Sequence, residues 1–257
     1  MTPGYEKIPR AREIGVLVAT DSHGATESLA EYDCSLQGNT LTLIQEAPSP
    51  ELLFRSDGEA FRAALFESAR RLAVELSFAG LLEVRFQVDV AGSAWVSSVR
   101  LGLVRQHTLV EMVTGLDLVA LQFSIAAGEP LPKELQTLEP KGHAVGASIV
   151  AMDQTDAVVE KLAFAPAPQG RSRTEPSATT GAILPTDDAA LIAKLTTYEP
   201  IRHRALLSMD RMLAEAQIAP FATNIDALRR VLGDYTFRAG QYDSQLGDKL
   251  EAAAGEA

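Results

Sequence analysis

Apolar residues follow two periods along this chain, and the period indicates which element each segment forms. Alternating or β-branched runs bounded by Gly, Pro or Asp predict strands. The predicted strands are residues 14–20, 26–30, 40–44, 83–90, 94–99, 145–151 and 192–197. The turn Asp21-Ser22-His23-Gly24 joins the first two strands as a hairpin, and Ala91-Gly92 joins a second hairpin.

Helical spacing of apolar residues predicts four helices. The first begins after Ser56 or Asp57, either of which can cap it, and has apolar positions from Phe61 to Leu76. Residues 109–126 form a strong helical stretch that Gly128 and Pro130 end. The remaining helices are expected at residues 202–216 and 224–232. Helices mixed with antiparallel hairpins place the chain in the α+β class.

Composition narrows the class of protein. The 257 residues, 46% of them hydrophobic, can fill one large domain or two small ones. A net charge of −11 argues against nucleic acid and anionic membrane as partners. One cysteine, Cys34, excludes an internal disulfide and fits a reducing cytosol. No run of 18 apolar residues is present, so we expect a cytoplasmic protein, with a disordered tail at 249–257.

Motifs in one order along most of the chain carry a family resemblance. They include EYDCSLQ at 31–37, EAPSP at 46–50, EMVTGLDLV at 111–119 and AAGEPLP at 126–132. This series resembles the biotin carboxylase family, ATP-grasp enzymes that carboxylate biotin. The resemblance implies an ATP-grasp-like antiparallel sheet with packed helices over residues 1–140 and a biotin-carboxylase-like C-terminal domain over 141–248. The family's N-terminal domain and most of its ATP lid have no counterpart in this sequence.

The residues that the family uses to hold metal differ in this chain. The family has one metal-binding glutamate in a Glu-Phe-Leu strand and another in a Glu-Met-Asn-x-Arg strand. Collinear comparison places Arg85 and Ser98 at these positions and Arg100 at the asparagine. Arginine in place of a carboxylate repels Mg²⁺. No His/Cys pair has zinc spacing and no phosphate-binding glycine loop is present, so no metal and no cofactor is expected.

The residues that the resemblance links to bicarbonate and biotin also differ. The family's catalytic arginine corresponds to Gly102, its general-base glutamate to Gln106, and a lysine to Thr42. Only Arg173 matches the arginine that the family directs at biotin and bicarbonate. ATP-dependent carboxylation is therefore not expected. Ser98, Gly102, Gly38 and Thr42 each replace a longer charged residue, which predicts a larger and less polar site suited to an apolar small molecule.

Three residues are candidates for catalysis in such a site. His107 is the candidate acid or base, since histidine is the usual side chain for this role, and Arg100 and Arg105 carry permanent charge. With Arg85, these arginines either bind a carboxylate or enolate oxygen, or instead face solvent or pair with Glu83 and Glu111. His107 also stands where the family has a Glu-His pair, which favours a structural role. The candidate pocket is lined by Arg85, Ser98, Gly102, Gln106, Thr42 and Arg173.

Two functions remain open at this point. In the first, the site binds an apolar or acyl-type metabolite and catalyses a cofactor-free cyclisation, isomerisation or dehydration with His107 and an arginine. In the second, the chain is a non-catalytic subunit that regulates or scaffolds an acyl-CoA carboxylase. Its protein partner is then either a second copy of the chain, in a homodimer, or another carboxylase subunit. The predicted helix 202–216 supports the second because it resembles part of the family's dimerising C-terminal domain.

Overall fold

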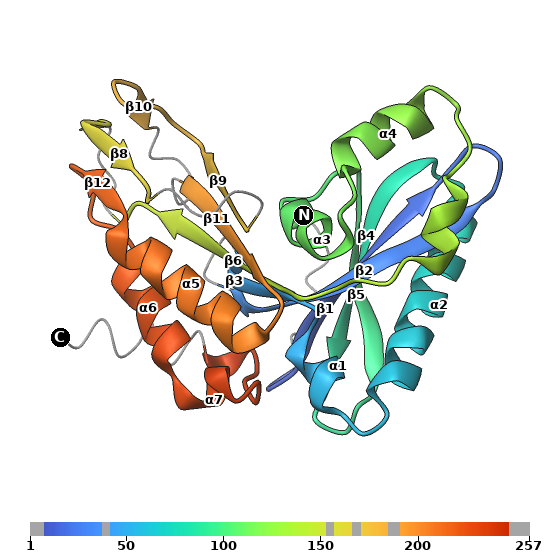
Figure 1. The fold of residues 1–257 in the computed structure, drawn as a ribbon. Coiled ribbons are helices and arrows are strands. Elements are labelled where there is room, and N and C mark those ends of the chain that lie inside the picture. Colours follow the sequence, from blue (N-terminus) through green and yellow to red (C-terminus); the bar gives the residue numbers. More distant parts are fainter. Residues whose placement is uncertain (1–7, 38–41, 153–156, 166–170, 185–190, 247–257) are drawn as a thin grey trace. The chain divides into compact units, whose positions relative to one another are not determined.

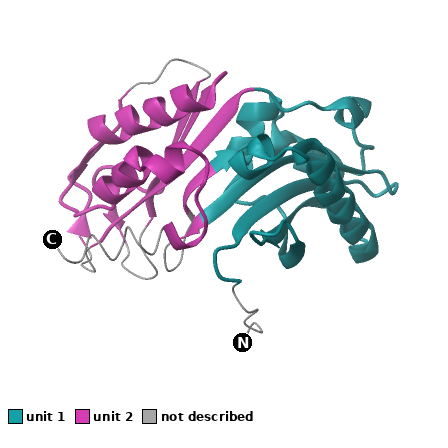
Figure 2. Ribbon diagram, turned by 90° about the horizontal axis from the view of Figure 1, so that it is seen from below, with its two compact units in different colours: residues 1–35, 46–141 teal, residues 36–45, 142–257 magenta. Residues whose placement is uncertain are grey.

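The computed structural model describes residues 8–37, 42–152, 157–165, 171–184 and 191–246 (Figure 1). The predicted tail at 249–257 and Gly38 lie outside these residues. The chain divides into two compact units (Figure 2). The first unit comprises residues 1–35 and 46–141, and the second comprises residues 36–45 and 142–257. Helices and antiparallel strands are mixed in both, which confirms the α+β class.

The first unit is built on an antiparallel sheet. Its strands are β1 (Arg12–Thr20), β2 (Thr26–Gln37), β4 (Gly80–Val88) and β5 (Ala94–Leu101), in the order β5-β4-β1-β2. Both predicted hairpins are present, β1–β2 across Asp21–Gly24 and β4–β5 across Ala91-Gly92. The Asp21 carboxylate fixes the first turn by accepting from the amides of His23 and Ala25, both at 2.9 Å.

The two faces of this sheet differ in polarity. Ile14, Val16 and Val18 alternate along β1 and form a core with Leu65 and Ala69 of α2 (Gly58–Leu76). The intervening positions must face the other way, because successive side chains in a strand alternate. Figure 1 shows α2 on one side of this sheet and α3 and α4 on the other. A short helix, α1 (Pro50–Phe54), precedes α2, and a 3₁₀ helix, η1 (Lys133–Thr137), follows α4.

The expected single helix over 109–126 is wrong. The structure has two helices, α3 (His107–Thr114) and α4 (Leu118–Ala126), which are bent by 103°. Gly115 ends α3 with a φ of 74°, which lies in the left-handed region that favours glycine. The Glu111 carboxylate accepts from the amide of Leu118 at 2.9 Å, and Asp117 caps α4 by accepting from the amide of Ala120. The EMVTGLD motif is thus a helix break with its own caps.

Within the described segments, no single helix is long and apolar enough to cross a membrane. Only α3 and α4 taken together reach that length and composition, and the pair is sharply bent.

The second unit also combines strands with helices. Its strands are β3 (Thr42–Ala47), β6 (His143–Val150), β11 (Leu191–Glu199) and β9 (Ser172–Pro176), adjacent in that order. Short strands are β7 (Ala157–Val158), β8 (Lys161–Ala163), β10 (Ile183–Leu184) and β12 (Gln217–Ala219). Helices α5 (Arg202–Glu215), α6 (Ile225–Gly233) and α7 (Tyr235–Arg238) complete it. Val145, Leu195, Met209 and Leu228 belong to one core, which packs α5 and α6 on the sheet.

Candidate functional site

A stripe of buried polar residues runs along β4. Glu83, Arg85 and Gln87 are 0%, 3% and 4% exposed, and they alternate with the core residues Val84 and Phe86. Their register with β1, where Glu83 faces Leu17 and Arg85 faces Gly15, places them on the sheet face opposite α2. Charges buried this deeply are tolerated only when they are paired.

Glu83 is the centre of a group of interacting side chains. Its Oε2 lies 2.8 Å from Arg85 Nε and 3.8 Å from Arg100 Nη1. Its Oε1 accepts a hydrogen bond from the Tyr32 hydroxyl. Arg85 Nη1 also lies 3.7 Å from Glu13 Oε2. We call Glu83, Arg85, Arg100, Glu13 and Tyr32 the Glu83 cluster. Its two carboxylates and two guanidinium groups cancel in formal charge.

The Tyr32 ring reaches Glu83 because β1 carries a glycine between them. Tyr32 pairs with Gly15 across β1 and β2, and Gly15 pairs with Arg85 across β1 and β4. A Cβ on Gly15 would lie 2.5 Å from the Tyr32 ring. Any larger residue at position 15 would therefore push the ring away from Glu83.

The pKa values in and around this cluster follow from burial. Burial and the neighbouring Glu83 raise the pKa of Tyr32 well above its usual range, so its hydroxyl keeps the proton. Burial also raises the pKa of the Cys34 thiol, which donates to the Glu13 carbonyl at 3.4 Å. Burial opposes the charge of Arg85, but the acidic groups of Cys34 and Glu83 raise its guanidinium pKa. Cys34 is thus a protonated thiol near neutral pH, unsuited to act as a nucleophile.

Three of the predicted site residues meet in the Glu83 cluster or beside it. Arg85 and Arg100 both contact Glu83, and Ser98 pairs with Arg85 across β4 and β5. Arg85 is buried, whereas the Arg100 side chain is 56% exposed. Arg85 Nη2 has no hydrogen-bond partner within the described segments. Pairing of Arg85 and Arg100 with Glu83 was one of the two interpretations open from the sequence.

Four other predicted residues lie at the end of β5 and the start of α3. Gly102 has a φ of 89°, donates its amide to the Leu81 carbonyl at 2.7 Å and has open space beside its Cα. Arg105 is exposed, and Gln106 is buried with no partner for Oε1 in the part of the chain described. His107 is half-buried, and its Nδ1 lies 2.9 Å from the Val104 carbonyl. Because a carbonyl oxygen only accepts, this contact fits a proton on Nδ1.

Thr42 and Arg173 belong to the second unit. Thr42 is the first residue of β3, and Arg173 is an exposed residue of β9 that pairs with Thr196 of β11. The predicted pocket therefore draws its residues from two units, and the cluster described above belongs to the first unit alone.

Sequence reasoning missed Glu83 as the central residue. Glu83 was named from the sequence only as a possible partner of the arginines, and the structure pairs it with Arg100 across the β4–β5 hairpin. A signal was present, because a single charge within the run Gly80–Val84 requires a buried partner. Tyr32 carried no comparable signal.

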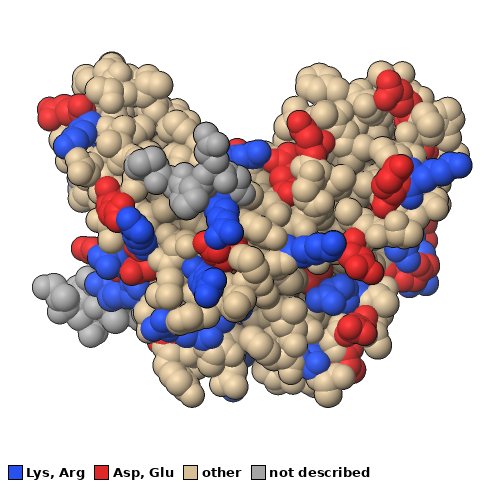
Figure 3. Space-filling model, viewed as in Figure 1, with Lys and Arg blue, Asp and Glu red and all other residues tan. Residues whose placement is uncertain are grey.

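Outside the Glu83 cluster, the described segments show no metal-binding arrangement of side chains. Within the described segments, no three His, Cys, Asp or Glu side chains form a group that could hold a metal ion. On the face shown in Figure 3, acidic and basic side chains are interspersed. The Glu83 cluster thus stands out by its burial and pairing, not by net charge.

Two protein-family models match the chain. The carbamoyl-phosphate synthase L chain ATP-binding domain matches residues 6–134, half of the chain. The biotin carboxylase C-terminal domain matches residues 157–248.

Curated relatives agree with these models. The mitochondrial methylcrotonoyl-CoA carboxylase subunit alpha of Rattus norvegicus is 32% identical over 89% of this chain and 32% of its own length. The biotin carboxylase of Halalkalibacterium halodurans is 29% identical over 91% of this chain and 51% of its own. The chain thus spans about half of the biotin carboxylase and about a third of the longer subunit.

Solved structures share the fold over nearly the whole chain. The biotin carboxylase domain dimer of the Hydrogenobacter thermophilus 2-oxoglutarate carboxylase, in complex with MgADP, ADP and bicarbonate, has a TM-score of 0.86, 25% identity, and coverage of 95% of this chain and 53% of that one. The Campylobacter jejuni biotin carboxylase has a TM-score of 0.84, 25% identity, and coverage of 95% and 54%. From the two matched models and this shared fold, the chain belongs to the biotin carboxylase family of ATP-grasp proteins.

Proposed function

We propose that this chain keeps the biotin carboxylase fold without its Mg-ATP chemistry, and that the exposed edge of the Glu83 cluster binds an acyl-type small metabolite. The observation that carries the proposal is the enclosure of Glu83 by two arginines, at 2.8 Å and 3.8 Å. The two arginines have different roles because they differ in burial. Arg85 neutralises Glu83 from inside, while Arg100 presents its outer guanidinium nitrogens to solvent.

The cluster does not fit a divalent cation. Mg²⁺ takes oxygen ligands at about 2.0–2.1 Å, so it would have to displace the Arg85 or Arg100 contact from Glu83. The displaced guanidinium would then stand within a few ångströms of the ion, where like charges repel strongly in a buried environment. Ser98, which faces Arg85 across the hairpin, offers a hydroxyl and no second carboxylate. We therefore derive no step that uses Mg²⁺ or ATP.

An acyl-type ligand fits the same arrangement better. A carboxylate or an enolate oxygen can accept hydrogen bonds from the exposed nitrogens of Arg100. The open space at Gly102 and the short side chain of Ser98 leave room beside it. His107 is the candidate to take a proton from such a ligand, which would allow a cofactor-free cyclisation, isomerisation or dehydration. The single buried thiol, Cys34, is the reason to place this activity in the cytoplasm.

Ligand-induced thermal stabilisation tests the proposal. Ligands that bind only the folded state raise its stability, by about 2.7 kcal/mol at one hundred times the Kd. We expect no shift with Mg-ATP and a shift with at least one member of a panel of acyl-CoAs and free acyl carboxylates. Arg100→Met should remove that shift. Arg70→Met, which changes an exposed arginine of α2 paired with Glu67 at 2.7 Å, should retain it. A clear Mg-ATP shift would refute the proposal.

A non-catalytic carboxylase subunit is the second candidate. Two of the similar proteins favour it: the rat relative is a carboxylase subunit, and the Hydrogenobacter domain is a dimer. Light scattering of the purified chain and co-purification with biotin-carrying subunits test this role. A stable complex with such a subunit, together with no response to the acyl panel, would select the subunit over the metabolite-binding protein.

A further inference from the structure

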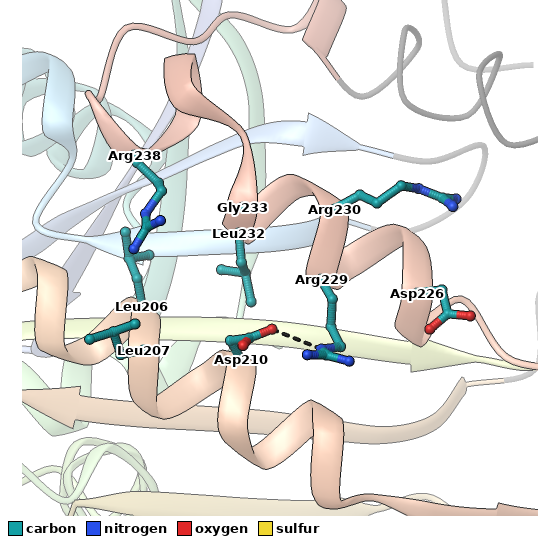
Figure 4. Close-up of a pocket in the computed structure, with 9 residues that line it drawn as sticks. All are labelled: Leu206, Leu207, Asp210, Asp226, Arg229, Arg230, Leu232, Gly233 and Arg238. Carbon is teal, nitrogen blue, oxygen red and sulfur yellow. Dashed lines mark hydrogen bonds and ion pairs between the residues drawn. The ribbon is translucent and has the colours of Figure 1, made fainter.

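A hollow of about 530 Å³ lies between α5, α6 and α7 of the second unit (Figure 4). Its apolar lining comes from Leu206 and Leu207 of α5 and Leu232 of α6. Its charged lining includes Arg238 of α7. A volume of about 300–1,000 Å³ is typical of small-ligand sites. We call this hollow the α5–α7 groove.

The charges of the α5–α7 groove are only partly satisfied. Arg229 Nε lies 2.8 Å from Asp210 Oδ1, so this pair is neutral. Within the described segments, neither Arg230 nor Arg238 has an ion-pair partner. In Figure 4 the Arg238 side chain points toward Leu206 and Leu207, whereas that of Arg230 extends away from them. Asp226 also lines the groove, so three arginines stand beside two aspartates. The groove therefore combines an apolar floor with a net charge of +1, in a chain whose net charge is −11.

Arg238 is held in place by buried contacts beneath it. Arg202, only 8% exposed, donates to the backbone carbonyls of Phe237 at 2.8 Å and Arg238 at 2.7 Å. Its guanidinium also lies over the Phe237 ring, 5.6 Å from the centroid. Asp234 caps the other end of α7 by accepting from the Phe237 amide at 2.9 Å. The backbone that carries Arg238 is thus fixed before any ligand arrives, which reduces the entropy lost on binding.

We infer that the α5–α7 groove binds a small organic carboxylate with an apolar chain. The carboxylate would pair with Arg238, and the chain would lie against Leu206, Leu207 and Leu232. An inorganic anion would not use the leucines, and an uncharged apolar molecule would not use Arg238. This site is independent of the proposed function, because all its residues belong to the second unit and none belongs to the Glu83 cluster.

The inference is tested by titrating the isotope-labelled chain with hexanoate, hexanol and inorganic phosphate. Binding is read from the NMR chemical shifts of the backbone amides. Hexanoate should shift the amides of Leu206, Leu232 and Gly233. Hexanol and phosphate should bind at least about tenfold more weakly, because hexanol lacks the charge-assisted hydrogen bond and phosphate lacks the apolar contact. Arg238→Met should weaken hexanoate by about tenfold and leave hexanol unchanged. Arg211→Met is the matched control, because Arg211 lies on α5, which lines the groove, but is paired with Glu215. It should leave the affinity for hexanoate unchanged.

A blocking variant separates binding in the groove from binding elsewhere. Gly233 has no atom within 4 Å of an added Cβ, so Gly233→Met can place its side chain without a clash. It should abolish the binding of hexanoate and keep the amide spectrum of the second unit otherwise native. Equal binding of hexanoate and hexanol, or hexanoate shifts that persist in Gly233→Met, would overturn the inference. Neither result depends on whether Mg-ATP or an acyl-CoA binds the first unit.

Discussion

Replacing Arg85 with methionine removes a buried positive charge in contact with Glu83. The two groups are 2.8 Å apart, and at an effective dielectric constant of about 20 this separation corresponds to about 6 kcal/mol of attraction. Part of that attraction is offset in the native protein by the dehydration of both ions. Breaking a buried pair by removing one partner costs about 3–5 kcal/mol in practice, because it leaves the other charge uncompensated.

The remaining partners of Glu83 place the expected loss at the lower end of that range. Tyr32 still donates its hydroxyl, and Arg100 still lies 3.8 Å away. Arg100 is 56% exposed, however, and pairs of this kind contribute at most about 1 kcal/mol. We therefore expect Arg85→Met to lower the free energy of unfolding by about 3 kcal/mol.

Urea unfolding followed by tryptophan fluorescence measures this loss in the first unit. Trp95, the only tryptophan, lies on β5 and pairs with Gln87 of β4, the strand that also carries Glu83. Arg70→Met, which removes an exposed pair, should change the free energy by less than about 0.5 kcal/mol. The double variant Glu83→Gln with Arg85→Met should be more stable than Arg85→Met alone, because it no longer buries an unpaired charge. A loss below about 1 kcal/mol, or a double variant no more stable than the single, would refute the pairing argument.

Three further predictions concern backbone caps, close packing and pH. Glu111→Ala should lower the free energy of unfolding by about 1–3 kcal/mol in a urea titration, because the amide of Leu118 loses its acceptor; Glu111→Gln should recover part of it. Gly15→Ala should cost about 1–3 kcal/mol in the same assay, because the new methyl group meets the Tyr32 ring. Burial, and then the charge of Arg202, lowers the pKa of His143 below 6.5 in the folded state. The unfolded chain therefore takes up the proton first as the pH falls, and stability should decrease from pH 7 to pH 5 by more than in His143→Gln, as urea midpoints at both pH values would show.

Local patterns were sufficient for most of the fold. Both hairpins of the first unit were predicted correctly because their turn residues are adjacent in sequence to the alternating strands they join. The helix break at Gly115 was not predicted, because an isolated glycine is tolerated within a helical pattern. The helix ends at Gly115 because the Glu111 carboxylate accepts a hydrogen bond from the amide of Leu118, in the first turn of α4. That side-chain contact exists only once both helices are formed.

The Glu83 cluster was less accessible from sequence for a related reason. Arg85, Ser98 and Arg100 could be singled out as residue types, but their partner depends on the register of β4 against β5. This register pairs Glu83 with Arg100 and includes an irregularity between Arg85 and Phe86. No periodicity reveals such a shift. Whether Thr42 and Arg173 join the same site stays a prediction, since they belong to the second unit.

The segment from Leu36 to Gln45 belongs to the second unit although residues of the first unit stand on both sides of it in sequence. Leu36 and Ile44, 1% and 2% exposed, lie in the same core as Val145 and Leu195. The first unit is therefore not a contiguous stretch of gene, and a fragment cut after Lys141 would carry two core residues of a partner that it lacks. Recombination or gene fission at that boundary would expose apolar surface on both products, so the two halves can be inherited separately only if this segment is redesigned.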